Sequence, residues 1–121
     1  MANVFAGKSN QNWLIAKKLH QERFIDAATN RYYYSVFQSV KGYAVGVGEM
    51  NESDSDRVHS AILVVVKGHS KAGAGVFFRR VVNELAGLRV KADYYSISVD
   101  ESELAPLLAD AEKVRNFFLE K

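Results

Sequence analysis

Apolar residues recur along most of this chain at spacings of three and four, which is the period of one face of a helix. The clearest stripe lies between positions 23 and 47, where the members that follow one another at those spacings are Ile25, Ala28, Tyr32, Val36 and Val40. Shorter stripes on either side, separated by glycines or small polar residues, predict further helices. We expect helices over residues 9–21, 23–47, 55–67 and 74–92, and a last helix that follows Asp100 and continues through Phe117.

The six apolar residues 61–66 fit two kinds of element. Their run of three valines is typical of a buried strand, but no other segment of the chain offers a convincing strand to pair with it. We therefore expect a helix here. Ser53 or Asp54 could cap this helix at its start, and Gly68 could close it.

The start of the last helix has its own signal, because Asp100 and Glu103 have the separation of a capping box. Pro106, the only proline, falls near that start, where proline is best tolerated. The chain has no internal repeat and no linker-like segment. These features together predict an all-α fold, an up-and-down bundle of four to five helices in a single domain over residues 1–121.

The composition supports a folded protein that needs no membrane. Of 121 residues, 48% are apolar and 25% are charged, which argues against disorder and against a membrane-spanning class. The absence of cysteine excludes disulfides, thiolate metal sites and a Cys nucleophile. No signal peptide is visible at the start, so we expect a cytoplasmic protein with no contact to a membrane.

Charge is distributed unevenly, although the net charge is only +2. Residues 57–91 hold seven Lys or Arg against one acid, whereas residues 93–121 hold seven acids against three bases. A basic fourth helix beside an acidic fifth suits a nucleic-acid groove or a self-complementary dimer. The same pattern would arise from two solvent-exposed helix faces whose opposite charges simply balance each other.

Four segments, in this order and spacing, resemble the HEPN family. The second expected helix contains Asn-Arg-Tyr-Tyr-Tyr at 30–34 and Gln38, similar to the family's N-R-x-Y-Y helix, in which a His often stands where Gln38 does. His59 lies near the start of the third helix, and Leu-Arg-Val-Lys-Ala-Asp-Tyr at 88–94 resembles the L-R-x-x-A-D-Y signature. An acidic helix follows, as in the family.

The resemblance implies a helical HEPN bundle that is commonly a homodimer and works on RNA or nucleotides. We expect no cofactor and no metal, because no set of His, Asp and Glu residues has metal-ligand spacing. Many members partner a minimal nucleotidyltransferase in toxin–antitoxin pairs, and others are metal-independent ribonucleases. The ribonuclease branch has a His four to six residues after an Arg. Here Arg89 supplies the Arg, but Tyr94 stands near the place of the His and no His follows position 69.

The sequence therefore leaves three functions open, and the third of them is a purely structural protein-binding adaptor. The first is a binding or regulatory protein that contacts RNA or nucleotide through basic and aromatic residues, namely Arg31, Tyr34, Arg79, Arg80 and Lys91. The second is a ribonuclease that uses Arg89 and Tyr94 across a dimer interface, because RNA cleavage needs a base and a cation. We expect Asp93, His59 and Gln38 to support either site.

Each of these residues also has a structural interpretation. Arg89 could pair with Asp93, four residues further along the same helix face. Arg31 could be satisfied by Asp26 or Asp93 while the neighbouring tyrosines pack the core. His59 could be a histidine whose hydrogen bonds are satisfied within the packed bundle.

Overall fold

The computed structural model describes residues 4–53, 59–70 and 74–121. Within these ranges the chain forms five helices and no strand: α1 (Val4–Gln21), α2 (Ile25–Gly46), α3 (His59–His69), α4 (Gly75–Tyr94) and α5 (Glu101–Leu119). The predicted all-α bundle is confirmed. The segment 61–66 lies inside α3, so the helical interpretation of its valines is correct.

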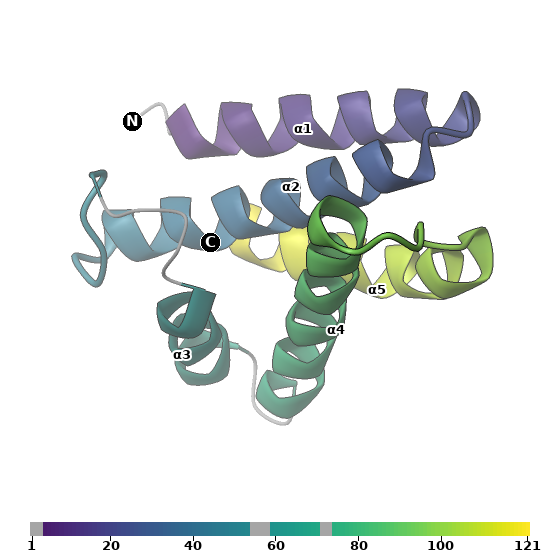
Figure 1. Cartoon of the computed structure of the whole chain (residues 1–121). Coiled ribbons are helices and arrows are strands. Elements are labelled where there is room, and N and C mark those ends of the chain that lie inside the picture. The colour runs from purple at the N-terminus through teal and green to yellow at the C-terminus, as the bar shows by residue number, and fades with distance from the viewer. Residues whose placement is uncertain (1–3, 54–58, 71–73) are drawn as a thin grey trace.

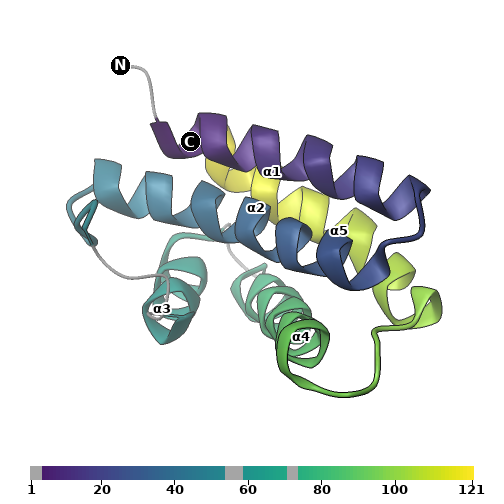
Figure 2. The same cartoon turned by 45° about the horizontal axis from the view of Figure 1, so that its top comes forward.

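Helix α2 is the centre of the bundle, because it packs against all four of the others. Figures 1 and 2 show α1 and α5 running alongside α2, while α4 crosses α2 steeply and α3 lies beside α4 on the side of α2 away from α1. More than half of the residues of α2 are buried. The helix contributes both its apolar and its small polar residues to the interior, since neighbours cover it on several sides.

The core is made of one apolar cluster to which every helix contributes. Its largest fully buried side chains are Tyr33, Phe37, Ile62, Leu85 and Leu104. Tyr32 and Tyr33 are both buried, as expected of tyrosines that pack a core. Removal of this apolar surface from water is the main source of stability, at about 25 cal/mol per Å².

Two helix ends use the Schellman arrangement, in which a residue with left-handed backbone follows the last turn. At the end of α2 this residue is Gly48, with φ of 80°, a conformation that glycine adopts without strain. At the end of α1 it is Arg23, with φ of 68°. The backbone N–H of Phe24 donates to the Leu19 carbonyl at 2.9 Å and closes the turn.

Several predicted boundaries need correction. Helix α1 begins at Val4 rather than at residue 9. The sequence pattern missed its first turns because apolar residues do not recur there at helical spacing. Helix α3 continues through Gly68 to His69, and α4 extends to Tyr94, two residues beyond the predicted end at residue 92. The predicted start of α3 near residue 55 and its cap at Asp54 fall outside the described residues, while Ser53 lies in a turn.

The predicted capping box at the start of α5 is confirmed. The Glu103 carboxylate accepts the backbone N–H of Asp100 at 3.1 Å, so it satisfies a donor at the helix end. Pro106 lies inside α5.

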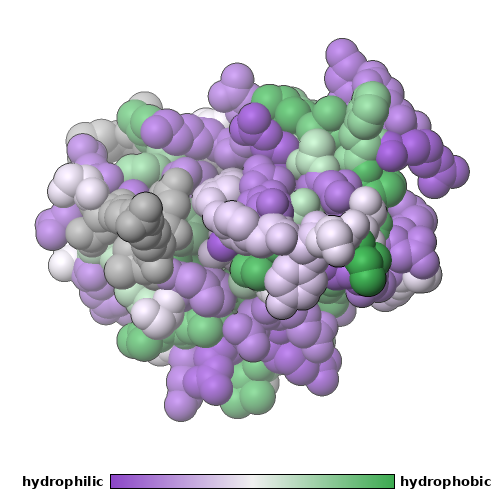
Figure 3. Space-filling model, in the orientation of Figure 1, coloured by the Kyte–Doolittle hydropathy of each residue, from purple (hydrophilic) through white to green (hydrophobic). Residues whose placement is uncertain are grey.

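The face seen in Figure 3 is mainly hydrophilic, with apolar groups exposed in separate places between polar ones. In the described part of the chain, no helix combines the length and apolar character that crossing a bilayer demands.

A buried arginine connects the last helix of the bundle with the first two helices. Arg115 of α5 is only 8% exposed, and its Nε donates to the hydroxyls of Ser35 at 2.9 Å and Ser9 at 3.1 Å. Its Nη2 donates to the Asn10 side chain, and its guanidinium carbon lies 5.3 Å from the centre of the Trp13 ring. One side chain thus connects α5 with α1 and α2.

Candidate functional site

Three helices bring polar and aromatic side chains together around Arg89. Its guanidinium carbon lies 5.2 Å from the centre of the Tyr33 ring and 5.7 Å from that of Tyr34. Both tyrosines belong to α2 and Arg89 to α4, so the contact spans the crossing of these helices. A guanidinium stacked on aromatic rings is held in place and remains a cation able to bind phosphate.

Asp93 fixes the outer side of this arginine. The Arg89 Nη1 donates to the Asp93 carboxylate at 3.3 Å, which confirms the predicted pair four residues apart. Asn30 of α2 donates to the same carboxylate at 3.1 Å and 3.3 Å. Arg89 is therefore oriented from two sides, by tyrosine rings and by a carboxylate that α2 itself positions.

His59 adds an imidazole from the start of α3. Its Nδ1 lies 2.9 Å from the Tyr33 hydroxyl. Burial lowers the pKa of His59, a contact with the Asn83 amide opposes this shift, and the positive charge of Arg89 lowers the pKa further. The ring is therefore neutral near pH 7, the form that can accept a proton.

Three buried side-chain atoms have no hydrogen-bond partner within the described residues: Gln38 Oε1, His59 Nε2 and Arg89 Nε. They come from α2, α3 and α4, the three helices that build this site. The Nδ1 of His59 is satisfied by the Tyr33 hydroxyl, whereas its Nε2 has no partner among the described residues, so the interpretation as a satisfied packing histidine holds for one ring nitrogen. Since buried polar atoms are normally paired, the two free nitrogens on neighbouring His59 and Arg89 indicate a region suited to polar ligands.

The lowered pKa of His59 predicts a pH dependence of stability. As pH falls below about 6.5, the ordinary value for His, the unfolded chain gains a proton that folded His59 resists. The free energy of unfolding should therefore fall from about pH 6.5 until the lowered pKa of the folded state is passed. Urea unfolding between about pH 8 and pH 5 would show a smaller loss in His59→Gln than in the wild type. His20 and His69 are common to both proteins and cancel, so parallel curves would contradict this assignment.

The other predicted site residues lie elsewhere. We call the group of Arg89, Asp93, Asn30, Tyr33, Tyr34 and His59 the Arg89 cluster. Tyr94 is 74% exposed at the end of α4, outside this cluster. Arg31 points to α1, where its Nη1 donates to Asn12 at 3.1 Å, so the expected partners Asp26 and Asp93 are wrong. Lys91 pairs with Glu103 of α5 at 2.7 Å.

Arg79 and Arg80 are exposed on the first half of α4, and Arg80 stacks on Phe77 at 5.5 Å. An open groove of about 720 Å³ lies between α3 and α4, and its lining residues are Ser60, Leu63, Val64, Lys67, Gly68, Arg79 and Asn83. Asn83 contacts both this groove and His59, so the groove leads from exposed cations toward the buried cluster.

Sequence reasoning missed Asn30, Tyr33 and Asn83 as parts of the site. Asn30, Tyr33 and Tyr34 are three and four residues apart on α2 and so share one helix face. That spacing was a usable signal. Nothing in the local sequence of Asn83 indicates its contact with His59, because the contact depends on how α3 and α4 pack.

The fold and this cluster define a helical-bundle protein with an arginine, a histidine and tyrosines gathered at a helix crossing. The family model described as HEPN domain matches residues 6–121. The chain therefore belongs to the HEPN domain family, which connects it in general with nucleotide- or RNA-related function. No curated protein and no solved structure matches the chain.

Proposed function

We propose that this protein is a binding or regulatory HEPN protein that acts on RNA, with the groove between α3 and α4 as the place where the RNA backbone lies. The observation that carries the proposal is that Lys67 and Arg79 line this groove, and that the described residues of its lining include no acid. Neither forms an ion pair with another described residue. Unpaired cations along a groove are the electrostatic requirement for phosphate binding.

The groove also offers more than charge. Leu63 and Val64 give it an apolar wall, while Ser60 and Asn83 give it polar groups beside the Arg89 cluster. RNA held here would bring a phosphate or a base near Tyr34 and Arg89. We also propose that the protein forms a homodimer. A nucleotidyltransferase-like protein, as in toxin–antitoxin pairs, would be its partner.

Replacing Lys67 and Arg79 with alanine together should weaken binding of a fluorescent oligouridylate by about tenfold or more. Each lost phosphate contact should also reduce the slope of log affinity against log salt concentration by about one. Fluorescence anisotropy at several salt concentrations measures both quantities. The matched control is Lys113→Ala, because Lys113 is an exposed lysine of α5, away from the groove.

Arg31→Ala belongs in the same series, because Arg31 was expected from the sequence to bind RNA yet lies against α1. If Arg31→Ala or Lys113→Ala weakens binding as much as Arg79→Ala, the RNA does not lie in the groove. An absence of salt-dependent RNA binding in the wild type would favour the protein-binding adaptor instead.

The geometry around Arg89 favours metal-independent RNA cleavage as a second candidate. His59 supplies from α3 an imidazole near Arg89, although no His follows Arg89 in the sequence. Its Nε2 has no partner among the described residues and could accept the 2′-hydroxyl proton, a role for which exposed Tyr94 is less suited. RNA cleavage in the presence of EDTA that is lost in both Arg89→Ala and His59→Gln would support this function. Intact RNA after incubation with the wild type would remove it.

A further inference from the structure

The turn between α1 and α2 has a separate pocket, distinct from the groove and from the Arg89 cluster. Its volume is about 350 Å³, and its lining residues are Lys17, His20, Gln21, Arg23 and Tyr32. None of the described residues that line the pocket carries a carboxylate. Among the described ion pairs, none includes Lys17 or Arg23. The pocket therefore presents to whatever enters it two cations that form no described ion pair, together with several hydrogen-bond donors, while the Glu101 carboxylate lies behind His20.

Arg23 stands at a position where its backbone is strained. Its φ of 68° lies in the left-handed region that glycine normally occupies after a helix end. A non-glycine residue there costs stability, and such strain occurs preferentially at functional positions. The turn thus holds a guanidinium at the rim of the pocket where a glycine would fold more easily.

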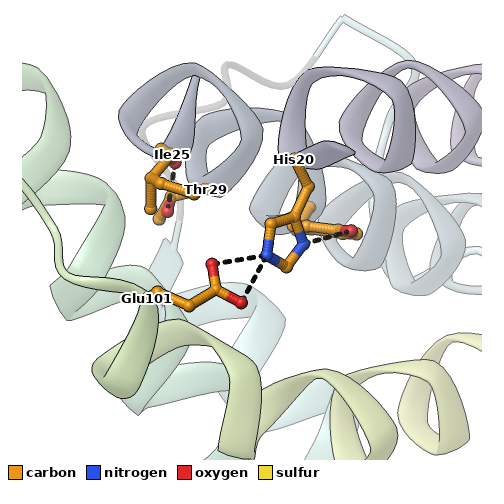
Figure 4. Close-up of polar contacts among 5 residues, drawn as sticks. His20, Ile25, Thr29 and Glu101 are labelled. Atoms are coloured by element: carbon orange, nitrogen blue, oxygen red, sulfur yellow. Dashed lines mark hydrogen bonds and ion pairs between the residues drawn. The ribbon is translucent and has the colours of Figure 1, made fainter. Parts of the chain in front are cut away.

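His20 forms the inner wall of the pocket, and its two nitrogens have different partners. Figure 4 shows the imidazole facing Glu101 of α5, and the Nε2 lies 2.7 Å from that carboxylate. The Nδ1 lies 3.1 Å from the Tyr32 hydroxyl. An ionised carboxylate can only accept a hydrogen bond, so Nε2 carries a proton. In neutral His20 the Nδ1 is then an acceptor, and Tyr32 donates to it.

Protonation of His20 reverses this second hydrogen bond. The Nδ1 then carries a proton and donates to the Tyr32 oxygen, which frees the hydroxyl hydrogen to point into the pocket. The hydroxyl itself keeps its proton, because burial, helped by the charges of Glu101 and Glu112, raises the pKa of Tyr32 to about 12. The pocket therefore gains one donor, while Glu101 balances the charge of the imidazolium.

We propose that this pocket binds a phosphate group, and that protonation of His20 turns the Tyr32 hydroxyl from the imidazole toward the bound phosphate. Lys17 and Arg23 neutralise the anion, and Tyr32 adds a hydrogen bond in the protonated state. Among the described residues, the charged groups around His20 are Lys17 from α1, Arg23 from the turn and Glu101 from α5, while Glu112 of α5 acts on the neighbouring Tyr32. The ligand is free phosphate or the phosphate of a mononucleotide. The proposal is independent of RNA binding between α3 and α4.

Sulfate is the sharpest probe of the proton switch, because its own charge is constant between about pH 5.5 and pH 8 and imidazoles titrate in that range. Isothermal titration calorimetry should show one sulfate bound, more tightly at the lower pH. Tyr32→Phe keeps the ring in the core but removes the hydroxyl, so its affinity at low pH should fall to the wild-type value at high pH. A wild-type affinity that does not change with pH would overturn the proposal, as would a pH dependence that survives in Tyr32→Phe.

A pair of neighbouring lysines tests the location. Lys17 lines the pocket, whereas Lys18 is exposed on α1 and does not. Lys17→Gln should weaken sulfate binding by about tenfold, the effect of one charge-assisted hydrogen bond, and Lys18→Gln by less than about twofold. Equal effects of the two substitutions would mean diffuse charge attraction and would overturn the proposal.

Substitution of Arg23 by glycine tests sulfate binding without a loss of folding stability. Glycine accepts the left-handed backbone, so this variant should melt no lower than the wild type while it binds sulfate about tenfold more weakly. Competition completes the test, since AMP should displace sulfate and adenosine should not. Displacement by adenosine would mean recognition of the nucleoside rather than of phosphate, contrary to the proposal. Undiminished affinity in Arg23→Gly would also contradict it.

Discussion

Truncation of Leu85 to alanine should lower the free energy of unfolding by about 3–4 kcal/mol. Leu85 of α4 is 0% exposed and belongs to the apolar core, and α4 packs against α2, α3 and α5. The loss combines the transfer of the removed methyl groups with the cavity they leave, which helices fixed on several sides fill poorly. For a domain of this size the melting temperature should fall by about 10–15 °C.

The matched control for Leu85 is Leu14→Ala on α1, where the side chain is 68% exposed. This substitution should change the free energy of unfolding by no more than about 0.5 kcal/mol. Denaturant unfolding of the three proteins measures the difference. Equal effects at the two leucines would mean that Leu85 does not lie in a packed core.

Arg115→Ala should lower the free energy of unfolding by about 2–3 kcal/mol, since it removes the contact with Trp13 and leaves a cavity between three helices. Ser9 and Ser35 keep hydrogen bonds to each other, because each hydroxyl also donates to the other's backbone carbonyl. The burial that lowers the pKa of Arg115 shows that the charge itself is costly to place there.

Arg115→Met is the informative companion variant. It fills most of the volume without the buried charge, so its stability should lie within about 1 kcal/mol of the wild type. Chemical denaturation of both variants separates packing from hydrogen bonding. A loss in Arg115→Met as large as in Arg115→Ala would show that the guanidinium hydrogen bonds, rather than its bulk, hold α5 to α1 and α2.

The helices could be predicted from the sequence because apolar spacing, the Asp100–Glu103 box and the single proline are local signals. The start of α1 at Val4 could not, since the residues of its first turns show little periodicity and are held by contacts with α2. Arg89 with Asp93 was predictable for the same reason, because four residues along a helix fix two side chains on one face.

The rest of the site depends on packing. His59 approaches Tyr33 across 26 residues of sequence, and Asn30 approaches Asp93 across 63. Arg31 and Tyr34 are only three residues apart, yet Arg31 faces α1 while Tyr34 faces Arg89. The spacing of residues along the sequence indicates which of them share a face of a helix. Which helix packs against that face depends on the arrangement of all five helices.

The position of Arg115 also has a consequence for the order in which the chain can become native during synthesis. Helices α1 and α2 leave the ribosome first, but Arg115, which covers Ser9, Ser35 and Trp13, follows eighty residues after Ser35. Until α5 has been translated, the α1–α2 hairpin exposes the surface that this arginine later seals. The nascent chain therefore passes through a long interval in which a chaperone, or a second nascent chain, can occupy that surface.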